Sequence, residues 1–338
     1  MKARILKLLK FLVFFGLGLF LIWWFQRKLS LLEKDQIIQA FYHVNYWWVG
    51  LSVVLGVLSH YVRAIRWKMM MEPMGYKPKT KTTFMAVMIG YLANLAFPRL
   101  GEVMRCGILN KYENVPINKS FGTVVTERVF DMIIFASLFF IVLFFEFARL
   151  KDYVYNEFWL GFANKFNNIN FTGFMMIVAM SVIALITVLG LVFRKKIIHS
   201  GIYSSIRVIV IGFLEGLKSL IHIKRPFLFI IYSLLIWLLY FLMLYVIFFS
   251  IEESASLGIL CGMAALVMGS VGIIVIPGGI GIYPLIISQT LVFYGLSKTT
   301  GYALGWVAWT SQTLTIMLLG LISFVILPII KRKEDAKA

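Results

Sequence analysis

The chain has 338 residues, of which 61% are hydrophobic and only 14% are charged, and its mean hydropathy is +0.89. A soluble domain needs a more polar surface, so the composition excludes a soluble catalytic domain and predicts an all-α, polytopic integral membrane protein. The 33 Lys and Arg against 15 Asp and Glu leave a net charge of +18, which we interpret as a sign of membrane orientation and not of a nucleic-acid partner.

Seven apolar stretches reach about the length that a helix needs to cross the hydrocarbon core of a bilayer. They lie at residues 8–26, 45–65, 129–148, 172–193, 226–250, 256–276 and 301–328. The first stretch begins like a signal peptide, but it lacks a small-residue cleavage site, so we interpret it as a retained helix. We therefore expect one membrane domain at residues 1–330 and a basic cytoplasmic tail at residues 331–338.

Two shorter apolar stretches are interrupted by proline and glycine. Residues 84–97 end at Pro98 and Gly101, and residues 282–296 begin just after a turn-forming sequence made of Pro277, Gly278, Gly279, Ile280 and Gly281. Irregular backbone at membrane depth is tolerated only inside the protein or beside a wet cavity. We therefore predict two broken or re-entrant segments whose breaks line one shared cavity. Paired interruptions are also compatible with an inverted repeat, which residue identities alone do not show.

The distribution of basic residues favours a topology in which both termini are cytoplasmic and residues 84–110 dip into the membrane and return. In that arrangement the net positive charge falls on the cytoplasmic side of the inner membrane. We then expect the segment around 277–300 to carry the chain outward before the last helix, as a broken crossing that is extended through the Pro-Gly-Gly turn. The alternative, in which residues 84–97 cross completely, places the basic loop 194–225 outside. This loop has the pattern of an amphipathic surface helix, which acts as a topology anchor or contacts anionic headgroups.

The most informative polar residues surround the first break, where Asn94 precedes the proline. Arg99, Glu102 and Arg105 then recur every third residue, so a resumed helix would align them on one face, with Glu102 paired to Arg105. Two guanidinium groups and one carboxylate leave this face net positive, which suits a lipid phosphate or another anionic headgroup. We favour a binding site over the alternative, an ion network that only holds the loop in place.

A second charged cluster leads into the apolar stretch at 129–148. Glu127 and Asp131 share one helical face, and Arg128 lies beside them. Two neighbouring carboxylates suit acid–base chemistry, but we favour salt bridges to arginines. The candidate partners are Arg63, Arg66, Arg99 and Arg105. Arg66 has two alternative interpretations, a headgroup contact or an interfacial anchor.

The residues that usually bind metals and nucleotides form no recognisable motif. Cys106 and Cys261 have no zinc-like spacing, and the four histidines are scattered. The sequence GxxxxGK[ST] is absent, so we do not expect ATP to drive the protein directly. We expect no cofactor and no metal.

Several motifs together resemble the lysylphosphatidylglycerol synthase transmembrane region, also called the flippase-like membrane domain. They are Arg66-Trp67, Asn94, Pro98-Arg99-x-Gly101-Glu102-x-x-Arg105, Glu127-Arg128-x-x-Asp131 and Pro277-Gly278-Gly279-Ile280-Gly281, and the resemblance extends over about residues 45–328. It implies that the protein moves a phospholipid or a modified lipid between leaflets. It also implies that the substrate is bound by Arg66, Asn94, Arg99, Glu102, Arg105, Glu127, Arg128 and Asp131.

Two departures from the family pattern leave alternatives open. No transferase domain follows the last helix, so we do not expect this chain alone to transfer lysine from tRNA. Tyr283 and Pro284 stand where family members often carry a glutamate, which leaves the lipid and any charge coupling undetermined. The alternatives are a membrane-embedded transferase acting on a lipid-linked substrate, and a membrane subunit that works with a separate soluble transferase. The expected partner is a membrane phospholipid with an anionic headgroup.

Overall fold

The computed structural model describes residues 30–97, 99–147 and 223–335, together with isolated positions at 23, 27, 149, 151 and 180. The regular structure of these residues is helical throughout. Most of the spans expected at 8–26 and 172–193 and of the loop 194–225, together with Pro98 and residues 336–338, lie outside the described residues.

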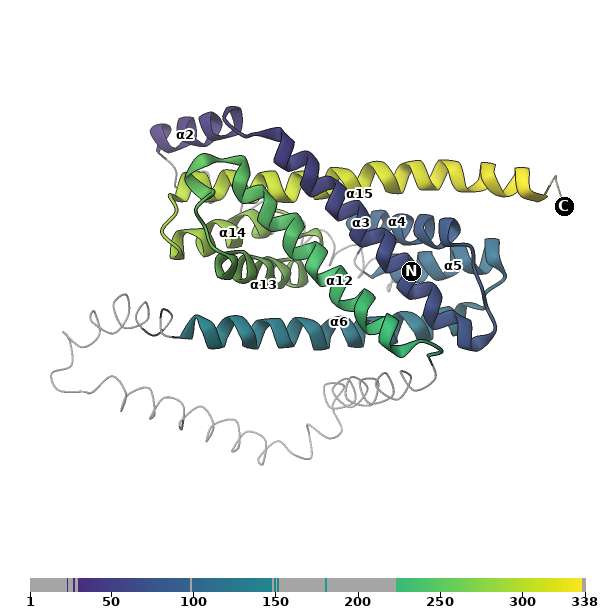
Figure 1. The fold of residues 1–338 in the computed structure, drawn as a ribbon. Helices are drawn as coiled ribbons and strands as arrows, with labels where there is room; N and C mark the ends of the chain where they lie inside the picture. The colour runs from purple at the N-terminus through teal and green to yellow at the C-terminus, as the bar shows by residue number, and fades with distance from the viewer. Residues whose placement is uncertain are drawn as a thin grey trace, which may run out of the picture.

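The described chain combines long and short helices (Figure 1). The long helices are α3 (Tyr46–Met71), α6 (Ile117–Phe145), α12 (Pro226–Tyr245) and α15 (Lys298–Asp335). The shorter elements are α2 (Leu31–Tyr42), η1 (Glu72–Met74), α4 (Thr80–Ala96), α5 (Leu100–Glu113), η4 (Val246–Ser250), η5 (Glu252–Ser254), α13 (Ile259–Val275), η6 (Pro277–Gly279) and α14 (Ile282–Phe293). Among the described residues, four segments, one around each long helix, are long and apolar enough to cross a membrane. The predicted all-α polytopic membrane protein is thereby confirmed.

Helices α3 and α6 extend well beyond the apolar stretches that predicted them. Helix α3 continues through the two arginines of its second half to Met71, and α6 begins at Ile117, ten residues before Glu127. The apolar pattern stops where charges appear, but the helical backbone does not. These charges therefore lie within helices and not at their ends.

Helices α4 and α5 form a re-entrant hairpin. At its open end, the backbone N–H of Lys79 donates a hydrogen bond to Glu113 Oε2 at 3.1 Å. At its tip, the backbone N–H of Gly101 donates to Asn94 Oδ1 at 2.7 Å. The chain reverses through Arg99, whose φ of 65° lies in the left-handed region. The re-entrant path predicted for this segment is present.

The two helices of this hairpin cross at a pair of glycines. A Cβ atom on Gly101 would lie 2.0 Å from the carbonyl oxygen of Gly90, closer than any side chain tolerates. Glycine at both positions lets the two backbones approach directly, which a larger residue would prevent.

Helices α13 and α14 form a second hairpin around the other predicted break. Its tip contains Gly278, Gly279 and Gly281, whose φ angles are 75°, 68° and 72°. Glycine adopts these left-handed angles without the steric cost that other residues incur. The indole Nε1 of Trp309 donates a hydrogen bond to the carbonyl oxygen of Gly278 at 2.7 Å, which ties the tip to α15. Helix α13 has 17 residues and is shorter than the stretch expected at 256–276. The crossing expected around 277–300 is wrong, because the chain turns back at this tip and Ser297, after α14, bonds to Glu253, before α13.

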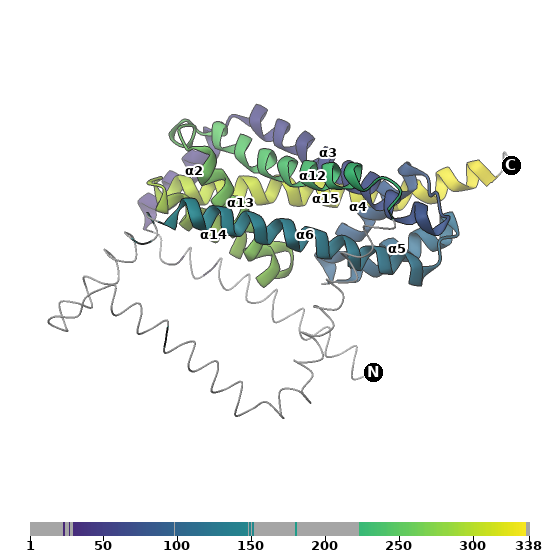
Figure 2. The same cartoon turned by 60° about the horizontal axis from the view of Figure 1, so that its bottom comes forward.

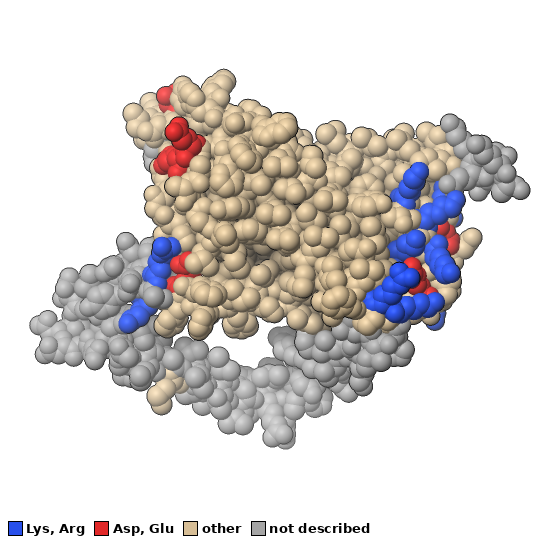
Figure 3. Space-filling model, in the orientation of Figure 1, with Lys and Arg blue, Asp and Glu red and all other residues tan. Residues whose placement is uncertain are grey.

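The two hairpins enter the helical bundle from opposite ends. One end, here called the basic end, is marked by the ion pair of Lys331 Nζ with Glu113 Oε1 at 2.7 Å, which joins the ends of α15 and α5. Lys and Arg gather at this end of the molecule (Figure 3). At the opposite end, Asn45 donates its backbone N–H to the carbonyl oxygen of Ser250 at 2.8 Å, which joins the start of α3 to η4. Each half of the chain thus has a long helix, a hairpin and a second long helix, in inverted orientations.

Helix α15 runs along both hairpins, and the two views show this arrangement (Figures 1 and 2). Its Gly305 lies against the backbone of Pro284 in α14, and its Gly320 lies against Leu92 in α4. The hairpin tips meet between these contacts, since Leu95 Cδ2 lies 3.7 Å from the position that a Cβ on Gly278 would occupy. The irregular backbone of both breaks is therefore gathered in the middle of the bundle.

Candidate functional site

Five charged side chains from three helices form a buried ion cluster beside the first hairpin. Helix α3 contributes Arg63 and Arg66, α5 contributes Arg105, and α6 contributes Glu127 and Asp131. Their exposed fractions are 4%, 0%, 4%, 0% and 8%, so bilayer and water barely reach them. The spacings of three residues in α3 and four in α6 place each pair on one helical face.

Glu127 is the centre of this cluster because it contacts all three arginines. Its Oε1 lies 3.3 Å from Arg63 Nη1 and 3.2 Å from Arg66 Nη2, and its Oε2 lies 3.0 Å from Arg105 Nη2. Asp131 accepts hydrogen bonds from Arg63 Nη2 at 2.9 Å and from Arg66 Nη2 at 2.8 Å. The predicted salt bridges of the two carboxylates are confirmed for these arginines.

Neighbouring side chains hold the arginines in place. Arg66 Nη1 donates to Ser233 Oγ of α12 at 3.0 Å. The guanidinium carbon of Arg105 lies 4.5 Å from the ring centroid of Trp67, a cation–π contact. Trp67 in turn donates its indole N–H to Thr123 Oγ1 at 2.9 Å. The charges are therefore preorganised by four helices.

The buried ion cluster carries an excess of positive charge. Three guanidinium groups face two carboxylates, which leaves one uncompensated positive charge. Charges in apolar surroundings are costly unless they are paired, so an excess charge favours the approach of an anion.

A narrow cleft connects the buried ion cluster to the tip of the first hairpin. Its volume is about 10 Å³, and its lining residues are Val87, Gly90, Tyr91, Asn94, Gly101, Glu102, Arg105 and Arg128. Within the described residues, Glu102 Oε2 and Arg105 Nη2 are buried and form no hydrogen bond. Arg105 Nη2 lies within ion-pair distance of Glu127 Oε2, but its N–H does not point at that oxygen. Two polar atoms at the cleft therefore have unused hydrogen-bonding capacity.

The structure gathers most of the predicted binding residues in one region. Asn94, Glu102, Arg105 and Arg128 line the cleft, and Arg66, Glu127 and Asp131 belong to the adjoining buried ion cluster. Whether a substrate binds these residues stays a prediction.

The expected pairing of Glu102 with Arg105 is wrong. Glu102 Oε1 accepts a hydrogen bond from Arg128 Nη2 at 2.8 Å, and Arg105 pairs with Glu127. Each pair joins two helices, because Glu102 of α5 faces Arg128 of α6 and Glu127 of α6 faces Arg105 of α5.

The expected alignment of Arg99 with the two following charges is also wrong. Arg99 has left-handed backbone angles and precedes the first residue of α5, so it does not share the helical register. It is exposed at the hairpin tip and forms no ion pair with any residue that the structure describes. The first hairpin thus presents an exposed cation at its tip.

The second break lies next to the first but does not line the cleft. The tips touch at Leu95 and Gly278, whereas the cleft-lining residues come from α4, α5 and α6. The shared cavity of both breaks, with Pro98, Gly101, Pro277, Gly278, Gly279 and Gly281 around it, stays a prediction, and Pro98 lies outside the described residues.

Two residues of the site were not among the predicted binding residues. Arg63 was expected only as a salt-bridge partner or a headgroup contact, and its ion pairs to Glu127 and Asp131 agree with the first of these. Ser233 carries no local signal, because a serine within an apolar helix more often bonds its own backbone. No group of three His, Cys, Asp or Glu side chains among the described residues is arranged to hold a metal ion.

Comparisons with known proteins identify the relatives of the chain. The family model described as the lysylphosphatidylglycerol synthase TM region matches residues 7–330. A UPF0104 membrane protein of Methanocaldococcus jannaschii is 35% identical over 104 residues, which is 30% of this chain and 31% of the relative. A second UPF0104 membrane protein of that organism is 26% identical over 256 residues, 73% of this chain and 99% of the relative.

A third relative bears the name of an enzyme. Glycosyltransferase AglD of Haloferax volcanii is 32% identical over 91 residues, which is 27% of this chain but only 15% of the relative. The matched part of the chain thus spans less than a third of the length of the first two relatives in order of similarity. No solved structure matches the chain.

Proposed function

Since the chain belongs to the lysylphosphatidylglycerol synthase TM region family, we propose that it binds a membrane lipid with an anionic headgroup and moves it between leaflets. In this proposal the buried ion cluster supplies the charge that attracts the headgroup. The protein acts in the cytoplasmic membrane, with its basic end on the cytoplasmic side.

The observation that carries the proposal is the net positive charge of the buried ion cluster, in which three paired guanidinium groups face two carboxylates. Arg105 is the member that also lines the cleft. The cleft as it stands has room for about one water molecule, so the proposal requires that it opens when a lipid binds. A phosphate oxygen that then replaces the poorly aligned contact to Glu127 would satisfy Arg105 Nη2 and neutralise the excess charge. Guanidinium groups bind phosphate through short, charge-assisted hydrogen bonds, so the ligand chemistry fits the donor.

The arrangement of the hairpins supports movement as well as binding. Irregular backbone from both halves meets in the middle of the bundle, and transporters with inverted repeats place their substrate sites at such a position. Arg99 is exposed at the tip of the first hairpin, so it is a second cation that is available to an anionic headgroup outside the cleft.

Transport in reconstituted vesicles tests the proposal. We expect the purified chain to speed the exchange between leaflets of a fluorescent phosphatidylglycerol, followed by quenching with an impermeant reductant. Arg105→Gln should slow this exchange about tenfold or more, because it removes one charge-assisted hydrogen bond to the headgroup. The variant should still fold, because Arg63 and Arg66 then balance Glu127 and Asp131. Lys119→Gln, which removes an exposed charge elsewhere, is the matched control.

Two results would contradict the proposal. One is exchange no faster than in protein-free vesicles of the same composition. The other is a folded Arg105→Gln protein that moves the lipid at the rate of the Lys119→Gln control.

The match to Glycosyltransferase AglD supports a second candidate, a membrane subunit that presents a lipid to an enzyme. Only 15% of that relative is matched, so the similarity is to a small part of a protein with that name. This candidate predicts binding without movement: the chain would retain an anionic lipid through Arg105 and leave leaflet exchange unchanged until an enzyme partner is added.

A further inference from the structure

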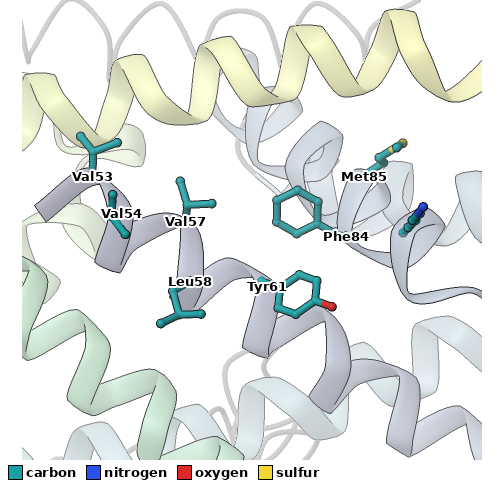
Figure 4. A pocket seen from close by; sticks show the side chains of 8 residues that line it. Val53, Val54, Val57, Leu58, Tyr61, Phe84 and Met85 are labelled. Atoms are coloured by element: carbon teal, nitrogen blue, oxygen red, sulfur yellow. The ribbon is translucent and has the colours of Figure 1, made fainter. Parts of the chain in front are cut away.

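A long apolar groove lies on the surface between α3 and α4 (Figure 4). Its volume is about 560 Å³, within the roughly 300–1,000 Å³ of typical ligand pockets. The lining residues are Val53, Val54, Val57, Leu58 and Tyr61 of α3 and Lys81, Phe84 and Met85 of α4. Apart from the ammonium group of Lys81 and the hydroxyl of Tyr61, the side chains that line it are apolar.

The groove has a cation at one end only. Lys81 is the second residue of α4, which starts at the basic end, and Phe84 follows one helical turn deeper. The Tyr61 and Phe84 rings lie 6.0 Å apart between their centroids and form the middle of the groove. Residues 53 to 61 of α3 extend it by about 12 Å along the helix axis. Lys81 is exposed and forms no ion pair in the part of the chain that the structure describes.

The groove is separate from the buried ion cluster. Arg63 follows Val54 by nine residues, which is two and a half helical turns, so the two side chains leave α3 on opposite faces. The groove and the cleft share no lining residue. A ligand in the groove therefore does not occupy the site of the proposed function.

We propose that the groove binds one anionic glycerophospholipid of the surrounding bilayer, with an acyl chain along α3 and the phosphate at Lys81. The side chains of Val54 and Leu58 are 61% and 44% exposed, so the groove is open toward the lipid that surrounds a membrane-crossing helix. An acyl chain matches its apolar length, and a phosphate at headgroup level matches Lys81, the one cation among the residues that line the groove. The inference requires only that the chain is a membrane protein, so it does not depend on lipid movement.

Photo-crosslinking with a phosphatidylglycerol that carries a diazirine in one acyl chain tests this site. We expect the reagent, in vesicles that contain the full chain, to label residues 53–61 and 84–85 more strongly than exposed Phe144 on α6. A phosphatidylcholine reagent with the same acyl chain should label the groove about fivefold less, the preference expected for one basic side chain at an anionic surface. Lys81→Glu should reduce groove labelling by the phosphatidylglycerol reagent at least about fivefold, whereas Lys119→Glu should leave this labelling unchanged.

A second variant separates this inference from the proposed function. Arg105→Gln should keep the groove labelling of the unmodified protein, because Arg105 is not a groove residue. Labelling spread evenly over α3 and α6, or equal labelling by both headgroups, would overturn the inference. So would disulfide-linked dimers of a Val57→Cys protein in which Cys106 and Cys261 are replaced by serine, since a second copy of the chain would then fill the groove.

Discussion

Glu127 determines the charge balance of the interior. It is fully buried and is the only described carboxylate that contacts three guanidinium groups. Glu102 has a different environment, since its partner Arg128 has a side chain that is 42% exposed. Water and salt weaken an exposed pair, whereas a buried charge without its partner has no such compensation. A comparison of the two glutamates therefore measures how burial changes the contribution of an ion pair to stability.

We predict that Glu127→Gln lowers the free energy of unfolding by about 3–5 kcal/mol, because it leaves three arginines facing a single carboxylate. Glu102→Gln should cost at most about 1 kcal/mol. Thermal unfolding of both proteins in one detergent checks this difference. Equal losses for the two variants would show that Glu127 is not the centre of the cluster.

The sequence predicted which charged residues belong to the site better than it predicted how they pair. Residue type and spacing indicated a net positive group around Arg105, and the salt bridges of Asp131 were expected. The partner of Glu102 was not predictable, because it depends on how closely α5 approaches α6. The expected position of Arg99 was wrong because its left-handed backbone angles place it outside the helix that begins at Leu100.

At the scale of the elements, each hairpin depends on small residues where its helices meet. Gly101 and Gly107 lie in the same helix, but only Gly101 faces another backbone. A Cβ on Gly107 would meet nothing within 4 Å. The difference in stability between a Gly101→Ala protein and a Gly107→Ala protein therefore measures the close contact between α4 and α5.

We predict that Gly101→Ala destabilises the protein by about 1–3 kcal/mol or more, since the overlap is with a carbonyl oxygen that cannot rotate away. Gly107→Ala should instead be neutral or stabilising by up to about 1 kcal/mol, because alanine favours a helix. Midpoints of thermal unfolding decide between them. A Gly101→Ala protein as stable as the Gly107→Ala protein would mean that α4 and α5 do not cross at this point.

Apolar length predicted the long helices and the two breaks, but not the path of the chain after the second break. Proline and glycine interrupt a helix without determining whether the chain continues across the membrane or turns back. Packing decides this: Gly269 of α13 lies directly against the side chain of Tyr283 in α14, so the two helices fit closely side by side. Contacts between residues this far apart have no local signature.

At the scale of the whole molecule, the hairpins enter from opposite ends and α15 joins them. Basic residues gather at the end where α15 finishes, which is the distribution expected of a cytoplasmic face. The inverted order of helix, hairpin and helix follows from the backbone, whereas the side chains of the two halves differ. This is why the repeat was not visible in residue identities.

We predict that an impermeant maleimide added to intact cells labels Glu252→Cys but not Lys111→Cys, each in a protein whose two cysteines are replaced by serine. The two positions are exposed at opposite ends of the described structure. The basic loop 194–225, which lies outside the described residues, should behave like Lys111→Cys. If Lys111→Cys were labelled from outside and Glu252→Cys were protected, the topology would be the reverse of the one we predict.

Lipid movement in the cell can be measured by leaflet-resolved lipid analysis of cells that lack the chain. We expect one anionic phospholipid, or a modified form of it, to accumulate in one leaflet of these cells. The unmodified chain and the Lys119→Gln protein should restore its distribution, and an equally abundant Arg105→Gln protein should not. An unchanged distribution without the chain, or full restoration by Arg105→Gln, would contradict the claim that the buried ion cluster moves an anionic lipid.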